Sequence, residues 1–155
     1  MAKVRLEPIY ASGLMLLYTL QVSAFDDLFT YYQDIATSPA TESYAKVKER
    51  FFKSNTSHFW ILNEENNTIV GAVRVEDNDD AMRLGNIFVL PQYQKNGYGT
   101  EAVQLLEAMY PGRKWITETI YQEIKLLNFY RRLGYKETDL LININEKTTL
   151  IIMEK

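Results

Sequence analysis

The sequence predicts an α/β (α+β) fold in which helices flank a mixed sheet. Short alternating or continuous apolar runs, bounded by polar turns, recur along the chain and are typical of strands. Longer segments carry apolar residues at helical spacing. The two patterns are interspersed, in the order strand, two helices, three strands, helix, strand, helix, two strands. This order favours a sheet covered by helices over an all-helical or all-strand domain.

The first half of the chain is predicted to supply three strands and two helices before the central motif. An apolar stripe predicts a long helix that starts near Ser12-Gly13, and Ser38-Pro39 is predicted to open a second helix with proline at its first position. A polar turn at 63–67 joins two strands into a hairpin, and a turn at 77–80 leads into the next strand. The three strands are 3–9, 58–62 and 69–76. A fourth strand, which ends at Leu90, belongs to the central motif.

The second half is predicted to end in a helix followed by a closing hairpin. Gly134 stands where a glycine commonly ends a helix, and Asn145-Glu146-Lys147 forms the turn of the hairpin. The predicted elements are a helix ending at Met109, a strand at 114–121, a helix at 123–133, and strands at 135–143 and 148–153.

Composition limits the classes of protein that this chain can be. Its 155 residues are expected to form a single domain, 1–155, with a sizeable core. The net charge of −3 argues against a nucleic-acid-binding surface. The lack of cysteine excludes disulfides, zinc–thiolate sites and a cysteine nucleophile, and it fits a reducing cytoplasm. No signal-peptide segment or bilayer-spanning apolar run is found, so we expect a cytoplasmic protein without a membrane partner.

Two polar features are interpreted as structural. The acidic run 77–80 lacks the spaced ligands and central glycine of a calcium loop, so no metal site is expected there or elsewhere. His58 is the one histidine, and neither a second histidine nor a carboxylate accompanies it in the sequence. We therefore expect His58 to be a packed residue and not a catalytic one.

The chemical centre of the sequence is a strand, a glycine-bearing loop and a helix. The apolar run 87–90 is closed by Pro91, and Gly97 and Gly99 precede the helix. Glycines let backbone N–H groups approach a ligand, and a helix start favours phosphate. The loop is no P-loop. The pattern Gly97-x-Gly99-x-x-Ala102 also matches a dinucleotide fingerprint, but residues 91–96 separate it from the strand and only a short tail follows.

Two stretches resemble the GNAT superfamily of acyl-CoA N-acyltransferases. Residues 94–99, Gln-Lys-Asn-Gly-Tyr-Gly, match its Gln/Arg-x-x-Gly-x-Gly/Ala signature, and residues 128–135, Asn-Phe-Tyr-Arg-Arg-Leu-Gly-Tyr, resemble its C-terminal motif. Both lie on the expected elements, and the order of elements agrees over nearly the whole chain. The resemblance implies a mixed, mostly antiparallel central sheet of about seven strands flanked by four helices.

The resemblance also implies acetyl-CoA as the co-substrate and an acetyltransferase activity by direct transfer. The backbone N–H of Val89 would meet the thioester carbonyl, and the Tyr130 phenol would protonate the departing sulfur. The residues implied in cofactor binding are Phe88, Val89, Leu90, Gln94, Lys95, Asn96, Gly97, Tyr98, Gly99, Thr100, Asn128 and Arg131.

The general base departs from the family's pattern. Many members carry a glutamate on the central strand, where this chain has Arg83. Glu118, on the next strand, is the best substitute and could accept the amine proton directly or through water. A structural or substrate-anchoring role for Glu118 remains open. Glu123 also replaces a common asparagine, which puts one usual cofactor contact in doubt.

The acceptor is expected to be a small cationic amine, such as a polyamine, an aminoglycoside or an amino-acid derivative. Asp34, Glu42 and Glu118 would attract a cation. Tyr31, Tyr32 and Tyr121 would stack on it. A peptide N-terminus or lysine is the alternative acceptor, and a non-catalytic acyl-CoA sensor is the alternative outside enzymes. Dimers are frequent among similar proteins, so a homodimer stays open.

Overall fold

The computed structural model describes residues 2–32 and 38–155 and contains one seven-stranded sheet. The strand order is β1-β2-β3-β4-β5-β7-β6, and each neighbouring pair is antiparallel except β4 and β5. The strands are β1 Val4–Pro8, β2 Thr56–Asn63, β3 Ile69–Asp77, β4 Met82–Val89, β5 Trp115–Ile120, β6 Lys136–Asn143 and β7 Thr149–Glu154. The α-helices are α1 Leu14–Tyr32, α2 Tyr44–Phe51, α3 Tyr98–Ala108 and α4 Ile124–Arg132.

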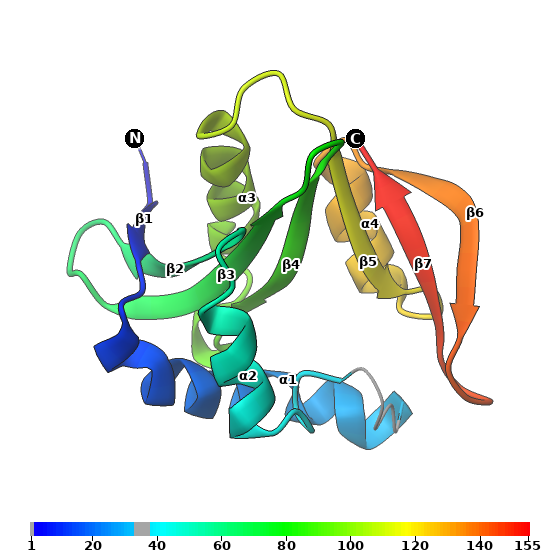
Figure 1. The fold of residues 1–155 in the computed structure, drawn as a ribbon, viewed down its shortest axis with the longest axis horizontal. Helices are drawn as coiled ribbons and strands as arrows, with labels where there is room; N and C mark the ends of the chain where they lie inside the picture. The colour runs from blue at the N-terminus through cyan, green and yellow to red at the C-terminus, as the bar shows by residue number, and fades with distance from the viewer. Residues whose placement is uncertain (1, 33–37) are drawn as a thin grey trace.

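The helices form a layer on each face of this sheet (Figure 1). The larger core cluster joins apolar residues of α3 and α4, such as Leu106 and Leu127, to one face of the strands. The smaller cluster joins Leu17 of α1 to Ala72 and Phe88 on the other face. The mixed, mostly antiparallel sheet with four flanking α-helices is therefore confirmed. Within the described residues, no helix combines the length and apolarity that crossing a membrane requires.

The second helix begins later than the sequence predicted. Ser38 to Thr41 form a turn, in which the Thr41 N–H donates to the Ser38 carbonyl at 3.1 Å. The hydroxyl oxygen of Ser43 accepts from the Lys46 N–H and caps α2 instead. Pro39 thus belongs to the turn and does not open the helix. The predicted C-cap is correct, because Gly134 follows α4 with a φ of +99°.

A β-bulge interrupts the pairing of β3 with β4. Val73 pairs with Ile87 and Val75 pairs with Leu84, so Gly85 and Asn86 together stand opposite Arg74. Such a bulge bends the strand and redirects its side chains. The bulge directly follows Leu84, the last residue of β4 that pairs with β5, and it therefore shapes the floor of the site described below.

His58 is held between the sheet and α2. It pairs with Arg74 in the β2–β3 register, and its ring lies 5.1 Å from that of Phe51, measured between centroids. Burial, together with the positive charges of Arg74 and Arg50, lowers the pKa of the imidazole to about 3. His58 is therefore neutral near pH 7, as a packed residue would be.

This lowered pKa predicts a loss of stability in mild acid. The unfolded chain takes up a proton on His58 below about pH 6.5, whereas the folded chain does not until about pH 3, so stability falls between these limits. The contribution lost by pH 5 is about 2 kcal/mol. His58→Gln lacks this titration. When both proteins are unfolded with denaturant at pH 7.5 and pH 5, the free energy of unfolding should fall more for wild type than for the variant. Parallel losses would contradict the placement of His58.

Candidate active site

The site forms where β4 and β5 separate. The two strands pair only at Met82 with Trp115, Arg83 with Ile116 and Leu84 with Thr117. Beyond these positions β4 continues to Val89 without a partner on this side, and Figure 1 shows the two strands diverging. A strand edge that is not paired leaves backbone N–H and C=O groups available to a ligand.

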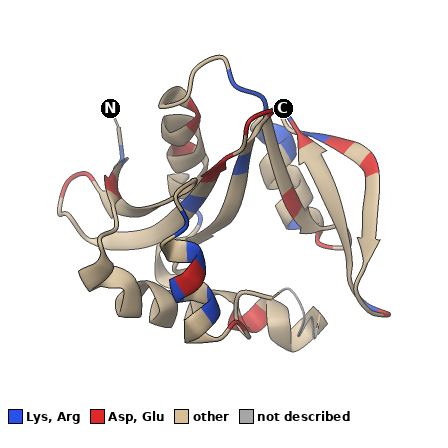
Figure 2. Ribbon diagram, viewed as in Figure 1, with Lys and Arg blue, Asp and Glu red and all other residues tan. Residues whose placement is uncertain are grey.

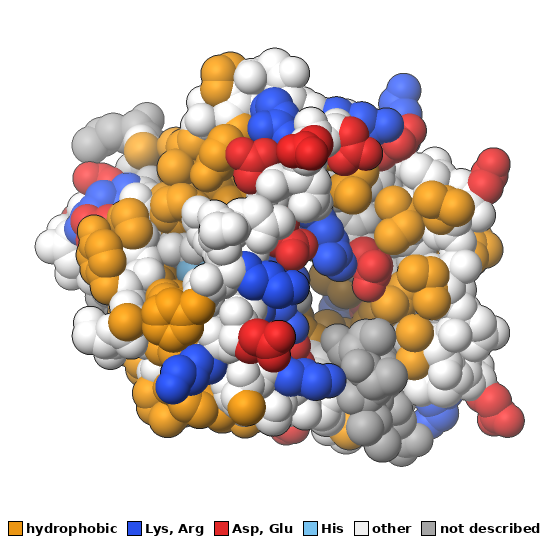
Figure 3. Space-filling model, viewed as in Figure 1, with side chains coloured by type: hydrophobic (Ala, Val, Ile, Leu, Met, Phe, Trp, Pro, Cys, Tyr) orange, Lys and Arg blue, Asp and Glu red, His pale blue; other side chains and the backbone are white. Residues whose placement is uncertain are grey.

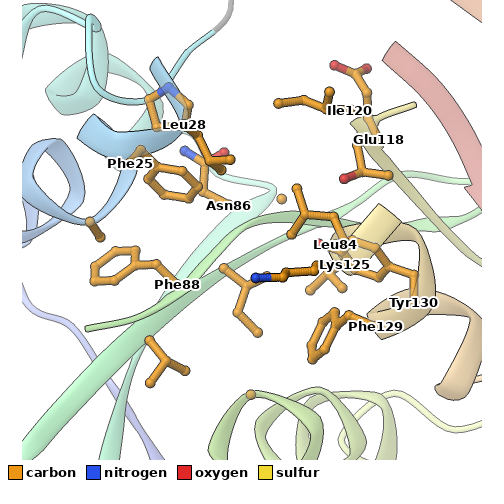
Figure 4. Close-up of a pocket in the computed structure, with 18 of the residues that line it drawn as sticks. Phe25, Leu28, Leu84, Asn86, Phe88, Glu118, Ile120, Lys125, Phe129 and Tyr130 are labelled. Atoms are coloured by element: carbon orange, nitrogen blue, oxygen red, sulfur yellow. The ribbon is translucent and has the colours of Figure 1, made fainter. Parts of the chain in front are cut away.

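A cavity of about 450 Å³ fills the space between the separated strands. In Figure 4, Phe25 and Leu28 of α1 stand on one side, while Glu118 and Ile120 of β5 stand on the other. Figure 3 shows the surface hollowed near its centre, with charged side chains of both signs around the opening. The polar or aromatic lining includes Phe29, Tyr32, Arg74, Arg83, Asn86, Phe88, Gln94, Lys125, Phe129, Tyr130 and Arg132.

The glycine loop leads directly into α3. Gly97 is the N-cap residue, with a left-handed φ of +79° that suits glycine. The first bond inside the helix runs from the Glu101 N–H to the Gly97 carbonyl, so the preceding N–H groups have no partner within the helix. The Asn96 amide donates to the Tyr93 carbonyl at 3.0 Å, and the Lys3 ammonium donates to the Asn96 carbonyl at 3.1 Å. The loop is thus held in a shape that suits a diphosphate.

The backbone of Val89 faces the open edge of β4. The Leu90 N–H donates to Val70 of β3, and successive residues of a strand point their backbone groups in opposite directions. The N–H and C=O of Val89 therefore point away from β3. The Gln94 side chain donates to the Val89 carbonyl at 2.9 Å. The Val89 N–H is the group that sequence reasoning assigned to the thioester carbonyl.

Tyr130 brings a buried phenol to the cavity. It lies on α4, is only 5% exposed and belongs to the larger core cluster. Burial raises the pKa of the Tyr130 hydroxyl to about 12, while a hydrogen bond with Thr117 acts in the opposite direction. The phenol therefore keeps its proton at neutral pH and is a hydrogen-bond donor there.

Glu118 lines the same cavity from β5 and is held by an arginine. Its Oε2 lies 3.5 Å from Nη2 of Arg83, and the other terminal nitrogen of Arg83 lies 3.2 Å from Glu76. Arg83 therefore bridges two carboxylates of β3 and β5 across β4. The predicted catalytic pair, Tyr130 and Glu118, is brought to one cavity.

Several predicted cofactor residues lie on or beside this cavity, and others do not. Phe88, Val89, Gln94 and Gly99 line it, whereas Asn128 and Arg131 are not among its lining residues. Arg131 instead donates to Asn128 and forms an ion pair with Glu137. The remaining predicted positions are Leu90, which is buried in the smaller core cluster, and the loop or helix-start residues Lys95, Asn96, Gly97, Tyr98 and Thr100.

Of the predicted acceptor residues that the structure describes, Tyr32 and Glu118 line the cavity, whereas the others do not. Tyr31 and Tyr121 are exposed, and neither lines it. Glu42 is committed to Arg50 and Gln21; although burial would raise its pKa, hydrogen bonds from Arg50 hold the pKa below its usual range. Figure 2 shows acidic and basic residues side by side on α2, which supplies Arg50. Asp34 lies outside the described residues.

Sequence reasoning missed Arg74 and Asn86, which line the cavity from β3 and β4. A signal for Arg74 exists, because it is the one charged residue within the apolar run 69–75. A charged residue in the middle of a buried strand needs a reason. No comparable signal exists for Asn86, whose position depends on the bulge.

Comparison with known proteins agrees with this geometry. The sequence model described as the acetyltransferase (GNAT) family matches residues 25–135. The chain belongs to the GNAT acetyltransferase family. One relative, an uncharacterized protein, YrkN, of Bacillus subtilis, is 32% identical over 85 residues, which are 54% of this chain. The match spans 46% of that protein, so the chain accounts for less than half of its length.

Solved GNAT structures share the fold at low sequence identity. An acetyltransferase from Thermus thermophilus superposes with a TM-score of 0.73 at 15% identity, covering 99% of this chain and 97% of the other. A spermidine N-acetyltransferase from Vibrio cholerae, in complex with CoA and spermine, gives 0.75 at 14% identity over 99% and 95%. The ribosomal-protein-S18-alanine N-acetyltransferase from Escherichia coli gives 0.74 at 17% identity over 97% and 92%.

The loop geometry predicts that Gly99→Val weakens CoA binding. A Cβ at Gly99 would meet Phe129 at 3.4 Å and Val89 at 3.7 Å, so the protein itself tolerates a small side chain. The larger, branched valine is expected to crowd the space in which the predicted diphosphate would lie. We expect the Kd for CoA, measured by calorimetry, to rise at least about tenfold, equivalent to roughly 1.4 kcal/mol. Gly13→Ala, away from the loop, is the control; unchanged CoA binding by Gly99→Val would remove the loop from the site.

Proposed function

We propose that the protein transfers an acetyl group from acetyl-CoA directly to the primary amine of a small molecule. The juxtaposition that supports this most is Tyr130 and Glu118 on one cavity, beside an open strand edge and the start of α3. A proton donor, a proton acceptor and an anion-binding helix start are the parts that acyl transfer from a thioester requires. Family membership supports the reaction class.

Each group has a role that follows from its position. The loop and the first N–H groups of α3 bind the diphosphate, and the open edge of β4 pairs with the pantetheine arm. The Val89 N–H stabilises the negative charge that develops on the thioester oxygen. The amine nitrogen forms a bond to the carbonyl carbon as the carbon–sulfur bond breaks. Glu118 accepts the amine proton, directly or through water, and Tyr130 donates a proton to the sulfur.

Glu118 also supports an amine as the acceptor. It is a carboxylate on the cavity wall and attracts the protonated amine, which loses one proton to solvent before the neutral amine attacks. The earlier assignment of Tyr31, Asp34, Glu42 and Tyr121 to the acceptor stays a prediction, and the proposal does not depend on it. Peptide acceptors and a non-catalytic acyl-CoA sensor remain the alternatives that the following experiment separates.

The proposal predicts CoA release when acetyl-CoA is incubated with small amines, and loss of this activity in Tyr130→Phe. The variant keeps the ring but loses the proton donor, so kcat should fall about a hundredfold while the Kd for acetyl-CoA stays within about twofold. Because the pKa of Tyr130 is about 12, the phenol stays protonated, and its ionisation should not lower wild-type kcat up to pH 10.

The control is Tyr135→Phe. Tyr135 is buried beside Tyr130, but its hydroxyl donates to Glu107 at 2.9 Å and does not line the cavity. The Tyr135→Phe variant should keep kcat within a few-fold of the wild-type value. Turnover on peptides alone would replace the small-amine proposal, and tight CoA binding without turnover on any amine would favour the sensor.

Glu118→Gln tests the proton acceptor. Glutamine retains the shape of the side chain but accepts no proton, so kcat/KM for the amine should fall about a hundredfold with acetyl-CoA affinity unchanged. Glu76→Gln is the matched control. It removes the other carboxylate that Arg83 contacts, and Glu76 does not line the cavity. If steady-state kinetics show equal losses for both variants, Glu118 acts through Arg83 and is not the base.

A further inference from the structure

Arg74 is a buried cation without a partner in the described part of the chain. It is 7% exposed, and its Nε is buried without a hydrogen-bond acceptor. No carboxylate of the described residues forms an ion pair with its guanidinium, whereas Arg50 and Arg83 each have one or more. Buried charges in proteins are normally paired, because removing them from water is costly. Within the described residues, Arg74 therefore has no carboxylate bonded to its guanidinium.

Among the described residues, the acidic neighbours of Arg74 are each bonded to another arginine, although their charges still act on it at a distance. Its charged neighbours are Glu42, Glu76, Arg50 and Arg83, but Glu42 is bound to Arg50 and Glu76 to Arg83. His58, opposite Arg74 in the register, is neutral near pH 7. Burial and the nearby Arg50 lower the pKa of Arg74 itself to about 10, which still leaves it charged at neutral pH.

Arg74 faces the cavity of the proposed active site. Its guanidinium lies over Gly85 of the bulge, where a Cβ would come within 2.3 Å of Nε and 2.8 Å of Nη2. Both Arg74 and Gly85 line the 450 Å³ cavity. A second cavity beside Arg74 has a volume of only about 10 Å³. That is room for about one water, so an organic anion has to enter from the larger cavity.

The sheet register sets Arg74 and Glu118 in one row. Leu84 pairs with Val75 on one side and with Thr117 on the other, so the next positions are Arg74 on β3, Gly85 on β4 and Glu118 on β5. Arg83, which contacts both Glu76 and Glu118, places these side chains on the same face. In a regular sheet two strand spacings would separate the two backbones by about 10 Å, and the parting of β4 from β5 widens this separation. A cation and a carboxylate thus lie across the cavity floor from each other.

We propose that Arg74 binds a carboxylate of the acceptor, so that the acceptor is an amino acid or a related amine that carries a carboxylate. This inference rests on the proposed acetyl transfer and names its substrate class. The carboxylate meets Arg74 while the amine faces Glu118, which matches the two charges of a zwitterion. A carboxylate can accept two parallel hydrogen bonds from the Arg74 guanidinium, which no described carboxylate contacts. A doubly charged phosphate would add repulsion with Glu76 and Glu118.

The test compares acceptors with and without this carboxylate, each at a pH that gives both members of a pair the same fraction of neutral amine. The pairs are glycine with glycinamide, L-phenylalanine with its amide, and L-ornithine with 1,4-diaminobutane, with phosphoethanolamine as the phosphate analogue. We expect kcat/KM to be about 10- to 100-fold higher for the carboxylate member, the range of a charge-assisted hydrogen bond to a buried group. Equal or lower values for the carboxylate members would overturn the inference, as would preference for phosphoethanolamine.

Two variants test the residue itself. Arg74→Met keeps the approximate length without charge, and Gly85→Ala displaces the guanidinium through its Cβ. Each should abolish the preference for the carboxylate member while the amide or diamine is still acetylated and CoA binds with unchanged Kd. Arg113→Met is the control, because Arg113 pairs with Asp77 and does not line the cavity. It should retain the preference.

Stability separates a binding role from a structural one. Removal of an unpaired buried charge should leave the melting temperature of Arg74→Met equal to or above that of wild type. A clearly lower melting temperature, with turnover lost equally for both members of each pair, would assign Arg74 to the fold and overturn the inference. If wild type turns over no amine at all, the proposed function fails instead. In that case the Kd values of N-acetylglycine and N-methylacetamide for the CoA complex still test Arg74 without turnover, because only N-acetylglycine carries the carboxylate.

Discussion

The end of pairing between β4 and β5 is the constraint on which the site depends. The ladder stops at Leu84 and Thr117, where the Thr117 hydroxyl donates to the Leu84 carbonyl at 3.0 Å. That bond satisfies a carbonyl at the point where the strands part, which a buried strand end requires. The rest of β4 then presents an unpaired edge. Without this separation there would be no cavity, no exposed Val89 N–H and no space beneath Tyr130.

The bulge in β4 acts at the same level and determines which charges meet the cavity. A regular strand would place one residue opposite Arg74, whereas the bulge places Gly85 and Asn86 there. Since Gly85 has no side chain, the guanidinium can lie across the strand. Arg83, just before the bulge, holds Glu118 and Glu76. One local irregularity thus leaves Arg74 unpaired while it fixes the carboxylate on β5.

Local signals predicted the order of elements and the glycine-bearing start of α3 well, because the features concerned are local; the binding of a cofactor by this loop stays a prediction. Gly97 has a left-handed φ, which a glycine in a tight loop before a helix can adopt. Gly134 follows the end of α4, as its place after the apolar stripe predicted. The late start of α2 was missed because Ser43, and not Pro39, supplies the cap. The roles of single charged residues were least predictable. Arg131 is engaged by Glu137, and Arg74 gains its importance from strands that lie far apart in the sequence.

The position of Tyr130 shows why this arrangement suits catalysis. Its ring makes edge contacts with Phe129 and Tyr135, and it belongs to the same core that α3 packs against. The packing that stabilises the fold therefore also fixes where the hydroxyl lies, so no loop has to close to place it. The cost is a polar group at the edge of an apolar core, close to Thr117. Thr117 also stands where the strands part, so the proposed proton donor lies at the opening through which the acceptor is proposed to enter.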